Sequence, residues 1–229
     1  DIAGNIITDI EEFKVDNTPP ETNKTYGEPY FTDGTSEWIT SSTPIYLNAV
    51  DGGDNCAIGA IKTYYRVEVV DEKSCWDPGT CCVPEHDPNE PNWTEYTTPF
   101  TINEESCHRI EYYSVDKLGN NESIKAQCVF VDNTPPVGTK KVGDPKKNCS
   151  SGKDCDYWVT QNTPITLTCT DQQPHPVGNE KVCFKVYVDE NNNTANYCTY
   201  FEGALNQEGY CCINSSTITL HFLEDSNHT

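Results

Sequence analysis

The stretch "WITSSTPIYLNAVD" at residues 38–51 has a second copy in this chain, "WVTQNTPITLTCTD" at residues 158–171. Both copies keep the Trp, the Thr-Pro-Ile step, a Leu and the final Asp at the same positions. After the Thr-Pro step, apolar and polar side chains alternate, which is the pattern of a β-strand with one buried face. A half-buried strand entered by the same turn is therefore predicted twice.

The sequence around this stretch is duplicated as well, and the matches keep their order. The hexapeptide "VDNTPP" precedes each copy, at 15–20 and 131–136, and "IGAIKTYYRV" at 58–67 corresponds to "VGNEKVCFKV" at 177–186. The chain is therefore a tandem duplication. The expected divisions are a terminal strand of a preceding repeat (1–16), a complete repeat (17–131) with an insertion (70–93), and a second repeat (132–229) lacking its last strands.

Each repeat of roughly 115 residues contains about seven short segments with strand periodicity, separated by turn signals, and none with sustained helical periodicity. "PIYLNAV" at 44–50 and "RIEYYSVD" at 109–116 are typical members. Proline in each "NTPP" ends the preceding strand because it has no N–H for the ladder. The predicted fold class is all-β, with two antiparallel β-sandwiches in tandem.

These motifs resemble the tandem immunoglobulin-like repeats of bacterial and archaeal surface and secreted proteins. In that family a "DNTPP" entry is followed by "W-x-T-x-x-P-I-x-L" and later by "Y-x-S-x-D-x-x-G-N", and residues 16–136 supply nearly all of this pattern. The resemblance continues in the second repeat as far as His228. It implies Ig-like β-sandwiches that act as spacers, adhesive modules or accessory domains. The high cysteine content and the insertion depart from the family pattern.

The charge of the chain excludes some partners. Fifteen basic and 36 acidic side chains give a net charge of −21, so nucleic acid is not an expected partner. No apolar run approaches the length of a membrane span, so no membrane insertion is expected in this segment. Residues 1–131 carry −16 of the charge and residues 132–229 carry −5. The first repeat is therefore the better place for a cation.

The chain has 13 cysteines without the paired spacing of a zinc ribbon or a thioredoxin-like site. We expect disulfides formed in an oxidising compartment, with the adjacent cysteines of each vicinal pair bonded to different partners because a ring between neighbours is strained. Sequence leaves the pairing open, and the odd number in the second repeat leaves one cysteine over. The predicted set is Cys56, Cys75, Cys81, Cys82, Cys107, Cys128, Cys149, Cys155, Cys169, Cys183, Cys198, Cys211 and Cys212.

Seven N-x-S/T sequons agree with an extracellular, cell-surface glycoprotein that carries N-linked glycans. They are Asn23, Asn92, Asn121, Asn148, Asn192, Asn214 and Asn227.

Acidic and amide side chains in two loops of the first repeat are candidate calcium ligands, although no cofactor is required for the predicted fold. The candidates are Asp51, Asp54, Asp116 and Asn120. The same residue types are common in turns, and the absence of an EF-hand ligand series favours that second interpretation.

No catalytic residue is predicted, because the sequence contains no nucleophile elbow, phosphate-binding glycine loop or H-E-x-x-H motif. His108 and His228 occupy equivalent repeat positions, which favours a structural role. Trp76 and Trp93 of the insertion suit either stacking on sugar rings or plugging the end of the sandwich, and the surrounding cysteines favour plugging.

The leading hypothesis is a structural repeat segment of a glycosylated cell-surface filament, stalk or sheath outside a prokaryotic cell. An adhesin or carbohydrate-binding array and the accessory domains of a secreted glycoside hydrolase are the alternatives. The expected partners are neighbouring repeats or subunits of the same protein. Residues 6–16 are expected to complete the sheet of such a neighbour by strand addition.

Overall fold

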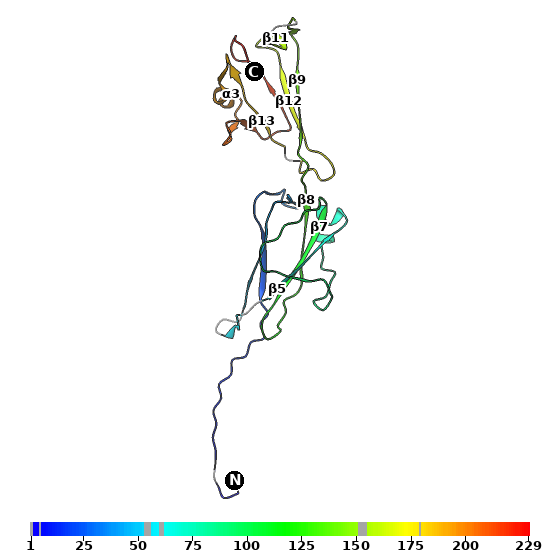
Figure 1. Cartoon of the computed structure of the whole chain (residues 1–229), viewed down its shortest axis with the longest axis vertical. Coiled ribbons are helices and arrows are strands. Elements are labelled where there is room, and N and C mark those ends of the chain that lie inside the picture. Colours follow the sequence, from blue (N-terminus) through cyan, green and yellow to red (C-terminus); the bar gives the residue numbers. More distant parts are fainter. Residues whose placement is uncertain (1, 5, 53–55, 60–61, 151–154, 179) are drawn as a thin grey trace. The chain divides into compact units, whose positions relative to one another are not determined.

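The structure, a computed structural model, describes residues 2–4, 6–52, 56–59, 62–150, 155–178 and 180–229. Strands predominate and helices are few and short, so the all-β fold class is confirmed. The chain divides into two compact units, unit 1 (Asp1–Asn133) and unit 2 (Thr134–Thr229) (Figure 1). This division lies two residues beyond the boundary expected from the sequence. The immunoglobulin-like assignment of each unit stays a prediction.

Unit 1 contains a two-stranded and a six-stranded sheet. Strand β1 (Glu21–Tyr26) pairs antiparallel with β4 (Ile45–Val50), and the larger sheet has the order β2-β3-β8-β7-β5-β6. A hydrophobic core joins the sheets, because Ile45 of β4 packs with Ile110 and Val129 of the larger sheet. The other elements are β2 (Tyr30–Thr32), β3 (Glu37–Ile39), β5 (Lys62–Val69), α1 (Lys73–Trp76), α2 (Pro78–Cys81), β6 (Thr94–Glu95), β7 (Cys107–Val115) and β8 (Lys125–Val131).

Unit 2 contains smaller sheets. Strand β12 (Ile165–Thr170) lies between β9 (Val137–Val142) and β18 (Thr217–Leu220), and β17 (Cys211–Ile213) lies between β13 (Val182–Phe184) and β16 (Ala204–Leu205). The core combines residues of both sheets with Tyr197 of α3 (Thr194–Tyr200). The remaining strands pair as two hairpins, β10 (Lys146–Asn148) with β11 (Tyr157–Val159) and β14 (Tyr187–Val188) with β15 (Asn191–Asn192).

The two units repeat the same local contacts at the duplicated stretch. Thr43 Oγ1 donates to the carbonyl of Pro29 at 2.6 Å, and Thr163 Oγ1 donates to that of Pro145 at 2.5 Å. Both threonines are fully buried. The N–H of Gly27 donates to the Pro44 carbonyl at 2.8 Å, as Gly143 does to Pro164 at the same distance. The duplication seen in the sequence is therefore also a duplication of turn geometry.

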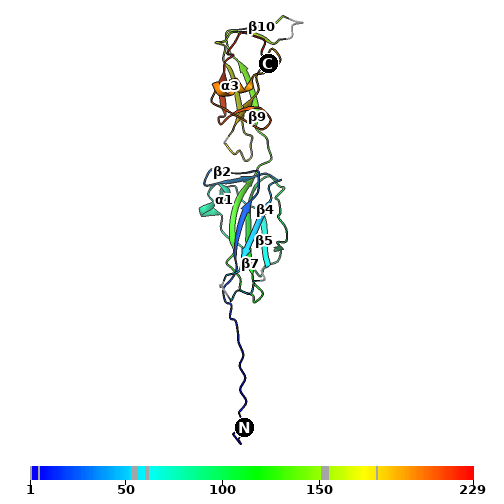
Figure 2. The same cartoon turned by 90° about the vertical axis from the view of Figure 1, so that its left-hand side faces the viewer.

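The insertion covers one face of the larger sheet in unit 1. Its helices α1 and α2 lie against that sheet (Figure 2), and α1 contacts β7 and β8. The eight residues of β7 from Cys107 to Ser114 are all buried, so this strand is covered on both faces. The strand predicted from "RIEYYSVD" is confirmed as β7, and the insertion shields the face that carries Arg109, Glu111 and Tyr113.

Residues 6–15 are extended and pair with no strand in the part of the chain that the structure describes (Figure 1). Ile7, Ile10 and Phe13 are 96%, 93% and 76% exposed. The prediction that this segment completes a sheet is therefore not met within the single chain.

Candidate functional site

Three carboxylates meet at one edge of unit 1, each placed by the end of a different strand or linker. Asp16 precedes the "NTPP" entry to β1, Asp51 follows β4, and Asp116 follows β7. Their ligand oxygens all lie within 4.8 Å of one another, and Asp16 and Asp116 are only 7% and 6% exposed. Like charges this close repel, so a cation among them would be stabilising.

Backbone N–H groups satisfy much of this cluster without a cation. Asp16 Oδ2 accepts the N–H of Ile58 at 3.0 Å, and Asp51 Oδ2 accepts that of Gly59 at 2.8 Å. Burial acts to raise the pKa of Asp116, but hydrogen bonds from the side chain and backbone of Asn120 outweigh it, and the pKa lies below 3.8. Among the described residues, Asp51 Oδ1 is buried and has no hydrogen-bond partner. The cluster is therefore partly a turn-stabilising network, as the alternative interpretation expected.

The predicted calcium ligands are only partly brought together. Asp51 and Asp116 are neighbours, whereas Asp54 lies outside the described residues. Asn120 donates its Nδ2 to Asp116 Oδ2 and to the Asp16 carbonyl, so it acts here as a hydrogen-bond donor. Asp16 was missed because its proximity arises from the fold, although its place in the repeated "VDNTPP" was a signal. Calcium binding stays a prediction.

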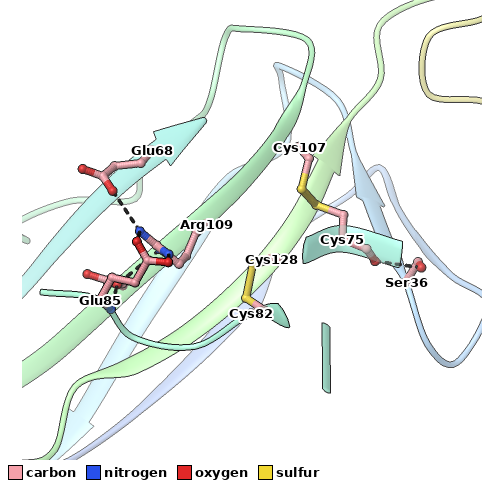
Figure 3. Close-up of a disulfide and its surroundings, with 9 residues drawn as sticks. Ser36, Glu68, Cys75, Cys82, Glu85, Cys107, Arg109 and Cys128 are labelled. Carbon is pink, nitrogen blue, oxygen red and sulfur yellow. Dashed lines mark hydrogen bonds and ion pairs between the residues drawn. A yellow bond between two sulfur atoms is a disulfide. The ribbon is translucent and has the colours of Figure 1, made fainter. Parts of the chain in front are cut away.

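Two disulfides fasten the insertion to the central strands of unit 1 (Figure 3). Cys75 of α1 bonds to Cys107 of β7, and Cys82 bonds to Cys128 of β8. Cys75 and Cys107 are fully buried, and the Cys75 carbonyl accepts the hydroxyl of Ser36 at 2.9 Å. The insertion is therefore held as a fixed part of the unit.

Unit 2 has three disulfides: Cys149–Cys155, Cys183–Cys212 and Cys198–Cys211. The vicinal pair of this unit thus bonds to two different partners, as ring strain predicted. Five disulfides are typical of a protein that folds in an oxidising environment outside the cytosol.

Three cysteines of the predicted disulfide set are unpaired in the structure, and the odd number in the second repeat had led us to expect one of them. Cys56 is exposed in the loop after β4, and Cys81 ends α2 beside the bonded Cys82. Cys169 of β12 is the one left over among the seven cysteines of unit 2. All ten other cysteines already bond to one another. Burial raises the pKa of the Cys169 thiol, and the charges of Glu180 and Asp171 raise it further.

A charged network also joins the insertion to the sheet, and no sequence pattern indicates it. The buried guanidinium of Arg109 on β7 lies 2.6 Å from Glu85 Oε1 of the insertion and 3.1 Å from Glu68 Oε2 of β5 (Figure 3). Burial acts to raise the pKa of Glu68, but hydrogen bonds from Arg66 and Arg109 lower it below 4.5. His86 Nδ1 lies 2.7 Å from the buried Glu111 Oε2.

The two tryptophans of the insertion pack on the body of unit 1. The ring of Trp76 lies 4.6 Å from that of Phe130, and Trp93 meets Tyr113 edge-on at 4.8 Å. Both rings therefore pack against the sheet face that the insertion covers, and Trp76 remains 45% exposed.

The repeated histidines make the same contact. His108 Nε2 lies 2.8 Å from the Glu104 carbonyl, and His228 Nε2 lies 3.0 Å from the Glu224 carbonyl. The equivalent geometry favours the structural role over a chemical one.

All seven sequon asparagines are exposed, so none would require unfolding to carry a glycan. They lie in both units, on strands β1, β10 and β15 and in loops.

No family model, curated protein or solved structure matches the chain. None of the helices in the described residues has the length and apolar character of a membrane-spanning helix.

Proposed function

We propose that the chain is a structural repeat segment of an extracellular, glycosylated surface filament, stalk or sheath. The duplicated turn geometry carries this proposal: the same Thr, Gly and Pro contacts recur in both units, and the repeated histidines make the same backbone contact. A unit that keeps the same stabilising contacts in each copy can be repeated along a chain to form an elongated protein. The repeated sequence motifs favour an Ig-like β-sandwich for each unit.

The disulfides and the exposed sequons support an extracellular setting. Ten of the 13 cysteines are bonded, and all seven sequon asparagines lie on the surface. Tethering by disulfides suits a small core exposed to conditions outside the cell. N-linked glycans on these asparagines would coat both units.

The proposal is tested on the protein from its source cells. Immunogold labelling of intact cells should mark external filaments or a surface layer, and mass spectrometry of the native protein should find glycans on the sequon peptides. Labelling that appears only after the cells are opened, together with unmodified sequons and reduced cysteines, would contradict it.

A further inference from the structure

Unit 2 presents an open sheet edge at a position that is filled in unit 1. Strand β11 pairs with β10 and with no other strand among the residues that the structure describes. Its repeat counterpart, β3, pairs with β2 on one side and in parallel with β8 on the other. The difference is visible in the repeated tryptophan: Trp38 of β3 is 3% exposed, and Trp158 of β11 is 64% exposed.

The segment before the first "NTPP" has the repeat position of the strand that fills this edge in unit 1. Aligning the two "VDNTPP" motifs places Phe13, Lys14 and Val15 at the positions of Val129, Phe130 and Val131 of β8. In unit 1, Val131 lies opposite Ile39 and Phe130 lies opposite Trp38. The segment is exposed and pairs with no described strand, so its backbone and apolar side chains are available.

The side chains of the segment fit the acceptor edge on both faces. Val129 and Val131 of β8 belong to the core, whereas Phe130 stacks with Trp38 on the opposite face. The segment keeps apolar residues, Phe13 and Val15, at the two core-facing positions.

The outer-face residues of β8 and of the donor segment differ, because the outer face is covered in unit 1 and open in unit 2. In unit 1, Trp76 of the insertion covers Phe130 and Trp38, so an apolar outer residue suits β8. In unit 2 the outer face of β11 is open, because Trp158 is mostly exposed. The segment has Glu12 and Lys14 at its outer positions, which suits contact with water, and a lysine opposite Trp158 adds a cation–π interaction.

Charge favours the same pairing. The segment carries Asp9, Glu11 and Glu12 against the single Lys14. Strands β9 and β10, which precede β11 in the sequence, carry four of the 15 basic residues of this acidic chain and no acidic one: Lys140, Lys141, Lys146 and Lys147. An acidic segment is therefore steered toward the most basic part of another copy.

We infer that residues 13–15 of one copy add to β11 of a second copy as a parallel strand, with Val15 opposite Val159 and Lys14 opposite Trp158. This inference deepens the proposed function and depends on it only for its biological purpose. The donor segment and the acceptor edge are different surfaces, so the contact is heterologous. An assembly of such copies has a free donor segment at one end and a free acceptor edge at the other. It therefore grows as an open chain, or closes into a ring when its two ends meet.

The test uses two complementary variants of the full chain. The donor variant Phe13→Asp/Val15→Asp and the acceptor variant Trp158→Asp change side chains that are 76%, 69% and 64% exposed, so neither disturbs a core. Tyr200→Asp, also at a position 64% exposed in unit 2, is the matched control for the acceptor, and Ile2→Asp is the control for the donor. Circular dichroism checks that every variant is folded.

Sedimentation velocity over a concentration series gives the result. The wild type and both controls should form species larger than 25.6 kDa, and each interface variant alone should stay at that mass. A 1:1 mixture of donor and acceptor variants should form a species of twice that mass and nothing larger, because only one working donor and one working acceptor remain.

A monomeric wild type, assembly that survives in either interface variant, or a mixture that stays monomeric would overturn the inference. These outcomes leave the proposed function intact, since surface location and glycans are measured separately. Conversely, heterodimers formed by a protein found unglycosylated inside cells would overturn the proposed function and leave the strand addition standing.

Discussion

Removal of the Cys82–Cys128 disulfide by a double substitution to alanine should strongly destabilise unit 1. The bond closes a loop with a sequence separation of 46 residues, for which the chain-entropy relation gives about 4 kcal/mol. The same relation gives about 2 kcal/mol for Cys149–Cys155, whose separation is 6 residues. The expected difference between the two double variants is therefore about 2 kcal/mol of unfolding free energy.

Urea denaturation followed by tryptophan fluorescence measures this difference. Trp38, Trp76 and Trp93 lie in unit 1 and report the loss of Cys82–Cys128. Unit 2 holds Trp158 alone, so the Cys149–Cys155 variant is also followed by circular dichroism, which records the unfolding of both units. The slope of free energy against urea should be compared as well, because a changed slope would indicate a changed denatured state. Cys56→Ala, at an exposed and unpaired cysteine, is the control and should leave the midpoint unchanged.

Equal losses in the two double variants would refute the reasoning from loop length. So would a loss below about 1 kcal/mol for the Cys82–Cys128 pair. In either case the insertion would be held mainly by its packing and by Arg109.

Three further predictions follow from other parts of the structure. Gly143→Ala should destabilise unit 2 by about 1–3 kcal/mol, because a Cβ there would lie 2.6 Å from Pro164 Cγ; Gly138→Ala, with open space around it, should be nearly neutral in the same thermal melt. Folding lowers the pKa of Glu68 and of Asp116, so their stabilisation is complete above their ordinary pKa values of 4.5 and 3.8 and is lost as pH falls through the lower folded values. Arg109→Met should therefore reduce the fall in the free energy of unfolding as the pH drops. A fall as steep as that of the wild type would argue against the ion pair between Arg109 and Glu68. If calcium binds at Asp16, Asp51 and Asp116, calcium but not magnesium should raise the melting temperature of the wild type and not of Asp116→Asn; an equal rise in both proteins would place the ion elsewhere.

The strands around the duplicated stretch could be predicted because their signals are local. The Thr-Pro-Ile step and the alternation after it mark β4 and β12, and both strands begin at the isoleucine. Because the sequence is duplicated, equivalent positions in the two repeats can also be recognised from sequence alone. Helices α1 and α2 could not be predicted, because four residues are too few to show a helical period.

The candidate site was harder to predict from the sequence, because its residues come together only in the folded chain. Asp16 and Asp116 are 100 positions apart, and no spacing rule connects them. The burial of Arg109 and Glu111 likewise depends on the insertion, which neutralises and covers them from a distance in sequence. Cysteine pairing had the same limit, since sequence could not choose among the pairings of the six cysteines of the first repeat that keep Cys81 and Cys82 apart.

The disulfides of the insertion also limit how far unit 1 lengthens under tension. When the chain is pulled from both ends, the load passes directly from Cys82 to Cys128, and the 46 residues of separation between them carry none of it. At roughly 3.5 Å per extended residue, about 160 Å of chain stays out of the loaded path. A surface array of such units would lengthen by a short distance and then resist. Reduction of both insertion disulfides would make it far more extensible, because Cys75–Cys107 still bridges most of the same stretch when Cys82–Cys128 alone is broken.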